Sequence, residues 1–170
     1  GGGIKGYDNA IITMNDTKVN SNISSNDGGG IHGAQQSDIT LINSEINNNV
    51  ADTSAVDTSY GGGVYLSGSS TMSIQGSEIN GNSTQKGGGL YVTDTSVVNI
   101  GSTTINTNIS TITGGGIYAF AESDIDLALY AKLFKEGHLH LGYFDPIPQN
   151  IESVSLTDIK ASMEAYSHLI

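Results

Sequence analysis

The sequence contains no cysteine, no arginine and no tryptophan, and only 2 of its 170 residues are proline. Without cysteine, disulfides and thiolate metal sites are excluded. The 6 basic residues oppose 17 acidic ones, and the net charge is −11. The clustered positive charge that nucleic acids and anionic membranes attract is therefore missing. No apolar run approaches the ~18 residues that a membrane-spanning helix needs. We therefore expect no nucleic-acid partner and no membrane insertion by this segment.

Glycine, in contrast, is abundant, with 23 residues, and most of these are clustered. A triple glycine followed by an aliphatic residue occurs five times, starting at Gly1, Gly28, Gly61, Gly87 and Gly114. The intervals of 27, 33, 26 and 27 residues lie in the range of solenoid repeats. Collagen, which has glycine at every third position, does not fit this clustering. The glycines therefore mark a repeat architecture.

Aliphatic residues stay in register with the triple glycines. From the aliphatic residue that follows each triplet, further aliphatic side chains recur 8, 10 and 15 positions on in the first four repeats. Ile39 with Leu41, and Met72 with Ile74, show the alternation of a half-buried strand. The sequence predicts an all-β fold, a right-handed parallel β-helix of about four to five rungs with three strands per rung, followed by a short α-containing C-terminal tail.

A helical solenoid and a disordered chain are the alternatives to this fold. Helices are disfavoured because Asn, Ser, Thr and Gly dominate the repeats. Low charge and many small polar residues would suit disorder. The fixed register of the aliphatic columns argues against it.

Asparagines also recur at fixed positions. We predict a structural ladder at the turns, where asparagine side chains can hydrogen-bond from rung to rung, formed by Asn22, Asn49, Asn82 and Asn108. The triple glycines are expected to supply unusual φ values at a tight corner. The 33-residue repeat carries its extra residues from Val50 to Tyr60, which predicts a protruding loop.

The pairing of a triple glycine and an aliphatic residue with a later Ile-Asn-x-Asn supports a family resemblance. It resembles the Gly-Gly-Ala-[Ile/Leu/Val] and Phe-x-x-Asn repeats of polymorphic outer-membrane proteins, and is similar to β-helical passenger domains of autotransporter-type adhesins. The resemblance covers residues 1 to about 127. Here the third glycine replaces the usual alanine, and Ile or Val replaces phenylalanine. The resemblance implies a secreted or surface-displayed structural or adhesive rod.

The repeat pattern ends near residue 127, where the composition changes. Both prolines lie beyond this point, and Lys132 occupies the next inward-facing position. We therefore divide the chain into β-helix repeats at 1–127 and a tail at 128–170. Residues 127–134 and 155–170 have the pattern of amphipathic helices. The tail is expected to be a helical cap on the end rung or the start of a truncated second domain.

The tail supports a second resemblance. Residues 129–134 (Leu-Tyr-Ala-Lys-Leu-Phe) and 138–144 (His-Leu-His-Leu-Gly-Tyr-Phe) look like the segment that precedes the cofactor domain in class I S-adenosylmethionine methyltransferases. The resemblance implies that Tyr130 and Tyr143 would lie near the cofactor. The glycine-rich loop that approaches the nucleotide does not follow in this chain. We therefore expect no methylation and no cofactor from the chain as it stands.

One outward-facing column begins at Lys5 and His32 and continues with aromatic residues. Tyr65, Tyr91 and Tyr118 are the candidate ligand-facing column, because aromatic rings and phenol hydroxyls suit carbohydrate. The alternative is that these tyrosines stack along the rungs for stability, since aromatic residues favour strands.

No cluster of catalytic residues stands out. Pectate-lyase-type β-helices rely on arginine, which is absent. Glu45 and Glu78 share one column at ~4.8 Å spacing and could resemble a retaining glycosidase pair, but a solvated surface column is the simpler interpretation. His138 and His140 alternate along the chain without an evident third metal ligand. We predict no catalytic, cofactor or metal site.

These observations predict a non-catalytic structural or adhesive β-helix segment of a secreted or surface-exposed protein, located extracellularly or at the outer-membrane surface. A surface glycan or host cell-surface molecule is the expected partner, and the first rung at Ile4 could pair with another chain. The alternatives are a carbohydrate-binding or polysaccharide-degrading β-helix, and a fusion fragment whose tail begins a methyltransferase. Because the chain starts in mid-repeat without an initiator methionine, we expect a processed protein or a fragment.

Overall fold

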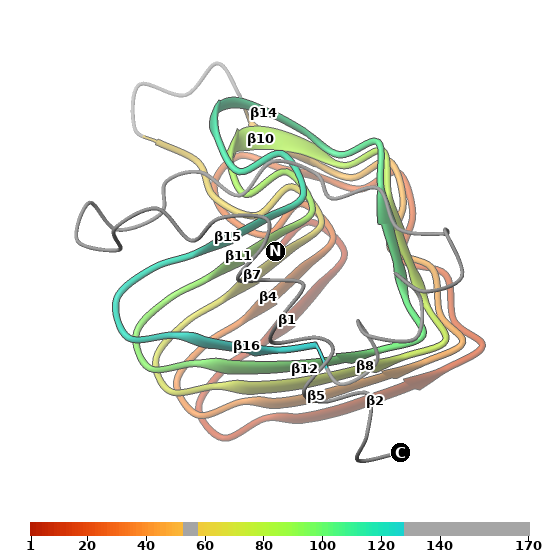
Figure 1. The fold of residues 1–170 in the computed structure, drawn as a ribbon, viewed down its shortest axis with the longest axis vertical. Coiled ribbons are helices and arrows are strands. Elements are labelled where there is room, and N and C mark those ends of the chain that lie inside the picture. The colour runs from red at the N-terminus through yellow and green to blue at the C-terminus, as the bar shows by residue number, and fades with distance from the viewer. Residues whose placement is uncertain (53–57, 128–170) are drawn as a thin grey trace, which may run out of the picture.

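The computed structural model describes residues 1–52 and 58–127, and this part of the chain is a parallel β-helix of five rungs. Figure 1 looks along the stack, so that corresponding strands of successive rungs lie behind one another around a central core. All strand pairs are parallel, and each strand pairs with its counterpart one rung away. The predicted parallel β-helix is confirmed. The tail at 128–170, with its predicted helices, lies outside the described residues.

Two sheets of five strands run the full height of the stack. The first follows the triple glycines and contains β1 (Ile4–Gly6), β4 (Ile31–Gly33), β7 (Val64–Leu66), β11 (Leu90–Val92) and β15 (Ile117–Ala119). The second contains β2 (Ile11–Asn15), β5 (Asp38–Ile42), β8 (Thr71–Gln75), β12 (Val97–Gly101) and β16 (Asp124–Asp126). Both correspond to strands that the sequence predicts.

The third sheet is short and the fourth is an addition to the prediction. The third pairs β9 (Glu78–Asn80) with β13 (Thr104–Asn106). Isolated bridges extend the third sheet through Glu45 to Lys18. The fourth contains β3 (Ile23–Ser24), β6 (Val50–Ala51), β10 (Ser83–Lys86) and β14 (Ile109–Thr113). Each of the first four rungs therefore carries one strand of a sheet that the sequence does not predict.

The fourth sheet escaped the hydrophobic pattern because its inner side is small and polar. Ser24, Ala51 and Thr84 are buried, whereas Ile23 and Ile109 on the outward side are 76% and 61% exposed. The strand thus reverses the usual alternation of apolar inside and polar outside. For this reason the spacing of apolar residues in the sequence does not predict the strands of the fourth sheet.

The core is a set of aliphatic columns that the pairing register aligns. Ile39 pairs with Met72, which pairs with Val98, and Leu41 pairs with Ile74, which pairs with Ile100. None of these side chains is more than 6% exposed. Burial of each such side chain contributes roughly 1.5–3 kcal/mol. The columns read from the sequence therefore form one continuous core.

The triple glycines form a corner where the main chain touches the next rung. The first glycine has a left-handed φ of 63° at Gly61 and 69° at Gly87, as the sequence predicts. At the second position the limit is space. A Cβ on Gly62 would lie 2.5 Å from the carbonyl oxygen of Gly88 and 2.6 Å from that of Ser83. Both neighbours are backbone, so no side chain fits there.

A ladder of asparagines lies inside the corner that precedes the fourth sheet. The Oδ1 of Asn82 accepts two hydrogen bonds from Asn49, one from its main-chain N at 2.9 Å and one from the Nδ2 of the Asn49 side chain at 3.0 Å. The Nδ2 of Asn82 donates to the carbonyl oxygen of Ile46 at 2.7 Å and to Asn108 Oδ1 at 2.9 Å. Asn22 donates to Asn49 in the same way. The side chains thus bond each of these rungs to the next.

A second asparagine column lies on the outer side of the same corner and is bonded in the opposite axial direction. The main-chain N of Asn47 donates to Asn20 Oδ1, and that of Asn80 donates to Asn47 Oδ1, each at 2.8 Å. In the inner ladder the main-chain N that donates to an asparagine Oδ1 belongs to the earlier rung, and here it belongs to the later one. The corner is therefore held in both directions along the axis.

The long repeat departs from the rung over fewer residues than expected. Val50 and Ala51 form strand β6, and Tyr60 is bridged to Lys86 of the next rung. Ser59 is buried, and its Oγ lies 3.1 Å from Thr84 Oγ1. Residues 53–57 lie outside the described part, so the insertion is anchored on both sides of this gap.

Over the described residues, no helix has the length and apolar character that crossing a membrane requires.

We expect Asn82→Ala to lower the free energy of unfolding by about 4 kcal/mol, because four hydrogen bonds of about 1 kcal/mol each are lost in a buried site. Urea denaturation followed by circular dichroism measures the change. Asn106→Ala is the matched control, since Asn106 is exposed and its Oδ1 accepts from Thr107 N. The control should lose about 1 kcal/mol or less. Equal losses for the two variants would contradict the assigned role of the inner ladder.

Candidate functional site

The candidate site is built on the first sheet, at the outward-facing position of each strand. The pairing register places Lys5 beside His32, His32 beside Tyr65, Tyr65 beside Tyr91 and Tyr91 beside Tyr118. The middle residue of each strand faces outward, because its two neighbours turn into the core. The sequence-predicted column Tyr65, Tyr91 and Tyr118 is therefore continuous in space.

The rings of this column stack on one another. The centroids of Tyr65 and Tyr91 are 5.6 Å apart with an interplanar angle of 26°, and those of Tyr91 and Tyr118 are 5.1 Å apart at 19°. His32 continues the column with its ring edge-on to Tyr65 at 4.8 Å. Such near-parallel pairs add about 0.5–1.5 kcal/mol each beyond the burial of their area.

Tyr60 closes the column from the side. It lies at the end of the insertion, and its ring centroid is 4.6 Å from that of Tyr91 and 6.1 Å from that of Tyr65. Its main-chain N donates to Asp27 Oδ1 at 3.0 Å, and Lys86 Nζ lies 5.8 Å from the centre of its ring. As a result Tyr91 is only 7% exposed. The middle of the predicted ligand-facing column is buried.

Burial changes the acid–base behaviour of these residues. It raises the pKa of Tyr65 and of Tyr91, because a phenolate is poorly solvated there. Burial likewise lowers the pKa of His32 to about 4, so that its imidazole is neutral at pH 7. Burial also raises the pKa of Asp27. The rings of His32, Tyr65 and Tyr91 are therefore uncharged at neutral pH.

The stacking decides how a ligand could approach. Ring faces that pack on neighbouring rings cannot also pack on a sugar, so the middle of the column offers edges and hydroxyls only. The geometry favours stacking for stability, the alternative weighed from the sequence. Within the described residues the stack ends at Tyr118, whose ring lies 6.4 Å from that of Phe120. Phe120 is 58% exposed, so aromatic surface is accessible at this end.

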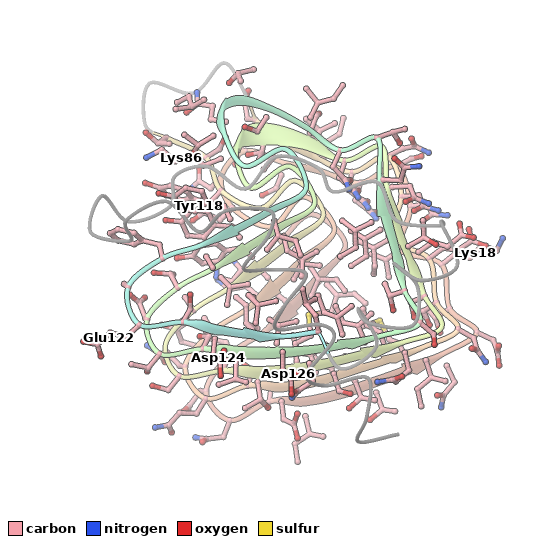
Figure 2. All side chains as sticks on the ribbon, in the orientation of Figure 1. Lys18, Lys86, Tyr118, Glu122, Asp124 and Asp126 are labelled. Carbon is pink, nitrogen blue, oxygen red and sulfur yellow. The ribbon has the colours of Figure 1, made fainter. Side chains whose placement is uncertain are left out.

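Sequence reasoning missed the second wall of this site. The residue directly before each triple glycine forms a neighbouring column, which consists of Asp27, Tyr60, Lys86 and Thr113. The side chain of Tyr60 packs against the tyrosine column, and Figure 2 shows Lys86 and Tyr118 on the same flank of the rod. The sequence could have indicated this column, because each of its residues stands directly before a triple glycine. Its residue types differ in every rung, so no pattern emerged.

The carboxylates predicted to share a column do so, and each has a hydrogen-bond partner. Glu45 is bridged to Lys18 and to Glu78 along the axis. Lys18 Nζ lies 2.7 Å from Glu45 Oε1, and Asn20 Nδ2 donates to Glu45 Oε2 at 3.1 Å. The hydrogen bond from Lys18 lowers the pKa of Glu45. A general acid needs a raised pKa instead. Glu45 therefore has the character of a carboxylate in a surface ion pair with Lys18.

The acidic residues of the last described rung point away from the rod. Asp124 and Asp126 flank the half-buried Ile125 in β16, and both are exposed (Figure 2). In the part of the chain that the structure describes, no group of three His, Cys, Asp or Glu side chains could hold a metal ion. His138 and His140, and the cofactor-proximal candidates Tyr130 and Tyr143, lie outside that part.

Comparison with known proteins matches the chain to a family. A family model described as a right-handed beta helix region matches residues 1–128. No curated protein and no solved structure matches the chain. The match covers the repeats up to the point where the triple-glycine pattern ends.

We expect His32 to remain neutral down to about pH 4 in the folded protein. Unfolding then takes up a proton between pH ~6.5, where an exposed histidine titrates, and pH 4. Stability should therefore fall as the pH is lowered through this window. NMR titration of the imidazole measures the pKa directly.

His32→Phe keeps a ring against Tyr65 and removes the titrating group, so it is the matched variant for urea denaturation. The variant should lose less stability than the wild type between pH 6.5 and pH 4. Identical pH dependence in the two proteins, or an imidazole pKa near 6.5, would show that His32 is not desolvated.

Proposed function

Because this chain belongs to the right-handed β-helix family, we propose that it is a non-catalytic structural or adhesive segment of a secreted or surface-exposed protein. The repeat fold itself suits a structural or binding segment. The observation that carries the proposal is the continuity of the inner asparagine ladder from Asn22 to Asn108.

The ladder supports a structural role because it makes the rungs act as one body. Every hydrogen bond in the ladder joins residues of neighbouring rungs. The triple glycines are joined between rungs by main-chain hydrogen bonds, and the aliphatic columns are joined by packing. In such a stack each rung is stabilised by its neighbours, so rigidity increases with the number of rungs. A stiff stack of this kind suits a stalk that holds a binding surface away from its anchor.

The outer surface supports a location outside the cell. Its exposed residues are mainly small and uncharged, and the chain has a net charge of −11. Together with the resemblance of the repeats to polymorphic outer-membrane and autotransporter-type proteins, this favours a surface-displayed rod. The expected partner is a glycan or another molecule of a cell surface.

Carbohydrate binding is a second candidate, and the open end of the aromatic column favours it. Tyr118 and Phe120 offer adjacent rings, of which Phe120 is largely exposed, and Lys86 lies on the same flank. Aromatic faces and nearby hydrogen-bonding groups are the usual means by which proteins hold sugars. The site would lie at Tyr118 and Phe120 and not at the buried Tyr91.

Beads coated with the protein should adhere to layers of cultured cells and to one or more immobilised glycans. Tyr118→Ala with Phe120→Ala should reduce retention by about tenfold, equivalent to about 1.4 kcal/mol, if the carbohydrate candidate is right. Thr13→Ala with Thr71→Ala, on exposed positions of the second sheet, is the control. Retention that is equal for all variants but absent for unfolded protein would support adhesion through another face. No retention on any surface would refute the adhesive role.

We expect no cleavage of neutral or acidic polysaccharides. The measurement is the release of reducing ends, and of unsaturated products by absorbance, during prolonged incubation. Product formation that Glu45→Gln or Glu78→Gln abolishes would instead establish a glycoside-cleaving enzyme and refute the non-catalytic proposal.

A further inference from the structure

The inner asparagine ladder coincides with a second pattern in the sequence. Asn-x-Ser/Thr, the acceptor motif for N-linked glycosylation, occurs four times in the chain. Three of the four acceptor asparagines are ladder residues, namely Asn22, Asn82 and Asn108. The fourth is Asn15, which is exposed at the end of β2.

The ladder uses the very atoms that glycosylation would modify. Asn82 is fully buried, and both protons of its Nδ2 are donated, one to Ile46 O at 2.7 Å and one to Asn108 Oδ1 at 2.9 Å. The Nδ2 of Asn108 donates to Ile79 O at 2.7 Å, and that of Asn22 donates to Asn49 Oδ1 at 2.9 Å. A sugar on Asn82 Nδ2 would have to occupy the space of one of its two bonded oxygens. A sugar on Asn22 or Asn108 would sit on a nitrogen that donates to the neighbouring rung.

The third residue of each motif is also part of the fold. Ser24 Oγ donates to Asp27 O at 3.1 Å, and Ser110 Oγ donates to Thr113 O at 2.6 Å. Thr84 Oγ1 lies 3.1 Å from Ser59 Oγ and is buried. These hydroxyls occupy the inner side of the fourth sheet just before the triple glycines. The motif therefore arises from two structural requirements two residues apart, a ladder asparagine and a small inner residue of the fourth sheet. Where that inner residue is Ala51, two positions after Asn49, the motif is absent.

We propose that the folded β-helix and N-glycosylation of its ladder asparagines exclude one another. In the transfer, Nδ2 attacks C1 of a sugar held on a lipid pyrophosphate. The N–C1 bond forms, the C1–O bond breaks, the lipid pyrophosphate leaves with the electron pair, and one Nδ2 proton passes to a base of the transferring enzyme. The product amide keeps a single N–H and carries an oligosaccharide.

Each consequence of that reaction opposes the ladder. The side chain of Asn82 loses one of its two donated hydrogen bonds, and the oxygen of Ile46 or of Asn108 loses one donor. The bulk of the sugar separates two rungs whose main chains are joined by hydrogen bonds. Acceptance of a glycan therefore requires an open rung, and a modified chain cannot close that rung. It follows that the folded protein is made by a route that leaves these asparagines unmodified.

This inference concerns biosynthesis and does not depend on the proposed adhesive role. It is tested by translating the full chain, behind a cleavable signal sequence, in the presence of microsomes that carry an oligosaccharyltransferase and its lipid-linked donor. Mass spectrometry locates the glycans, and limited proteolysis of the same sample reports folding. Molecules with a glycan at Asn22, Asn82 or Asn108 should all be protease-sensitive, and protease-resistant molecules should carry a glycan at most at Asn15.

Two variants and one inhibitor make the result decisive. Gly62→Ala cannot form the glycine corner, keeps all four motifs and should be modified at the ladder positions. The triple variant Ser24→Ala, Thr84→Ala, Ser110→Ala removes three motifs, keeps every ladder asparagine and repeats the alanine found at Ala51, so it should be protease-resistant from the same microsomes. Wild-type chain made with an inhibitor of lipid-linked oligosaccharide synthesis should also be resistant, and this arm stands even if the triple variant fails to fold.

A protease-resistant molecule with a glycan on a ladder asparagine would overturn the proposal. So would a Gly62→Ala chain left unmodified at the ladder, or inhibitor-treated wild type that remains as protease-sensitive as the glycosylated chain.

Discussion

The close approach of the main chain to itself at the triple glycines is the constraint on which the rest of the structure depends. At this corner the amide of Gly29 donates to the carbonyl of Gly61 at 3.0 Å, and that of Gly88 donates to Gly114 at 2.9 Å. These bonds join the second glycine of one triplet to the first glycine of the next, with no side chain between them. Because the corner admits only glycine, it fixes where each rung begins, and all other columns are phased from it.

The inner asparagine ladder strengthens this phasing beside the glycine corner, because a Cβ on Gly63 would lie 3.0 Å from Asn82 Nδ2. A shift of one residue in the register would move every aliphatic side chain to the outer face and would leave each ladder amide opposite the wrong partner. The buried amides have their hydrogen bonds only in the correct register. Aliphatic packing therefore supplies most of the stability, while the ladders and the glycines together select one alignment of the rungs.

Most of the fold could be predicted from the sequence because its restraints repeat. The columns through Ile39 and Leu41 and the asparagines of the ladder recur at constant offsets, and repetition reveals them without knowledge of the structure. The fourth sheet could not be found in this way, because Ser24 and Thr84 turn inward and Ile23 turns outward. The corner before the glycines needs small inner residues. Hydrophobic periodicity does not detect a strand whose buried side chains are small and whose apolar side chains face outward.

The site was harder to predict because it depends on a residue that does not repeat. The alignment of Tyr65, Tyr91 and Tyr118 follows from the repeat and was predicted. The burial of Tyr91 does not, because the covering ring of Tyr60 comes from the one insertion in the series. No offset relates Tyr60 to an equivalent aromatic residue in another rung, so only the folded chain shows the contact.

The same contrast indicates where function resides in this rod. Positions that every rung shares are occupied by the requirements of stacking, as the ladder asparagines and the triple glycines show, and they have no freedom to evolve a ligand contact. Positions that differ between rungs are free of those requirements. Where the insertion brings Tyr60 onto the column, the middle tyrosines become part of the packing, and exposed aromatic surface remains toward Tyr118 and Phe120. Under the proposed binding role, a partner should therefore be recognised by the irregular features of one flank and not by the repeat itself.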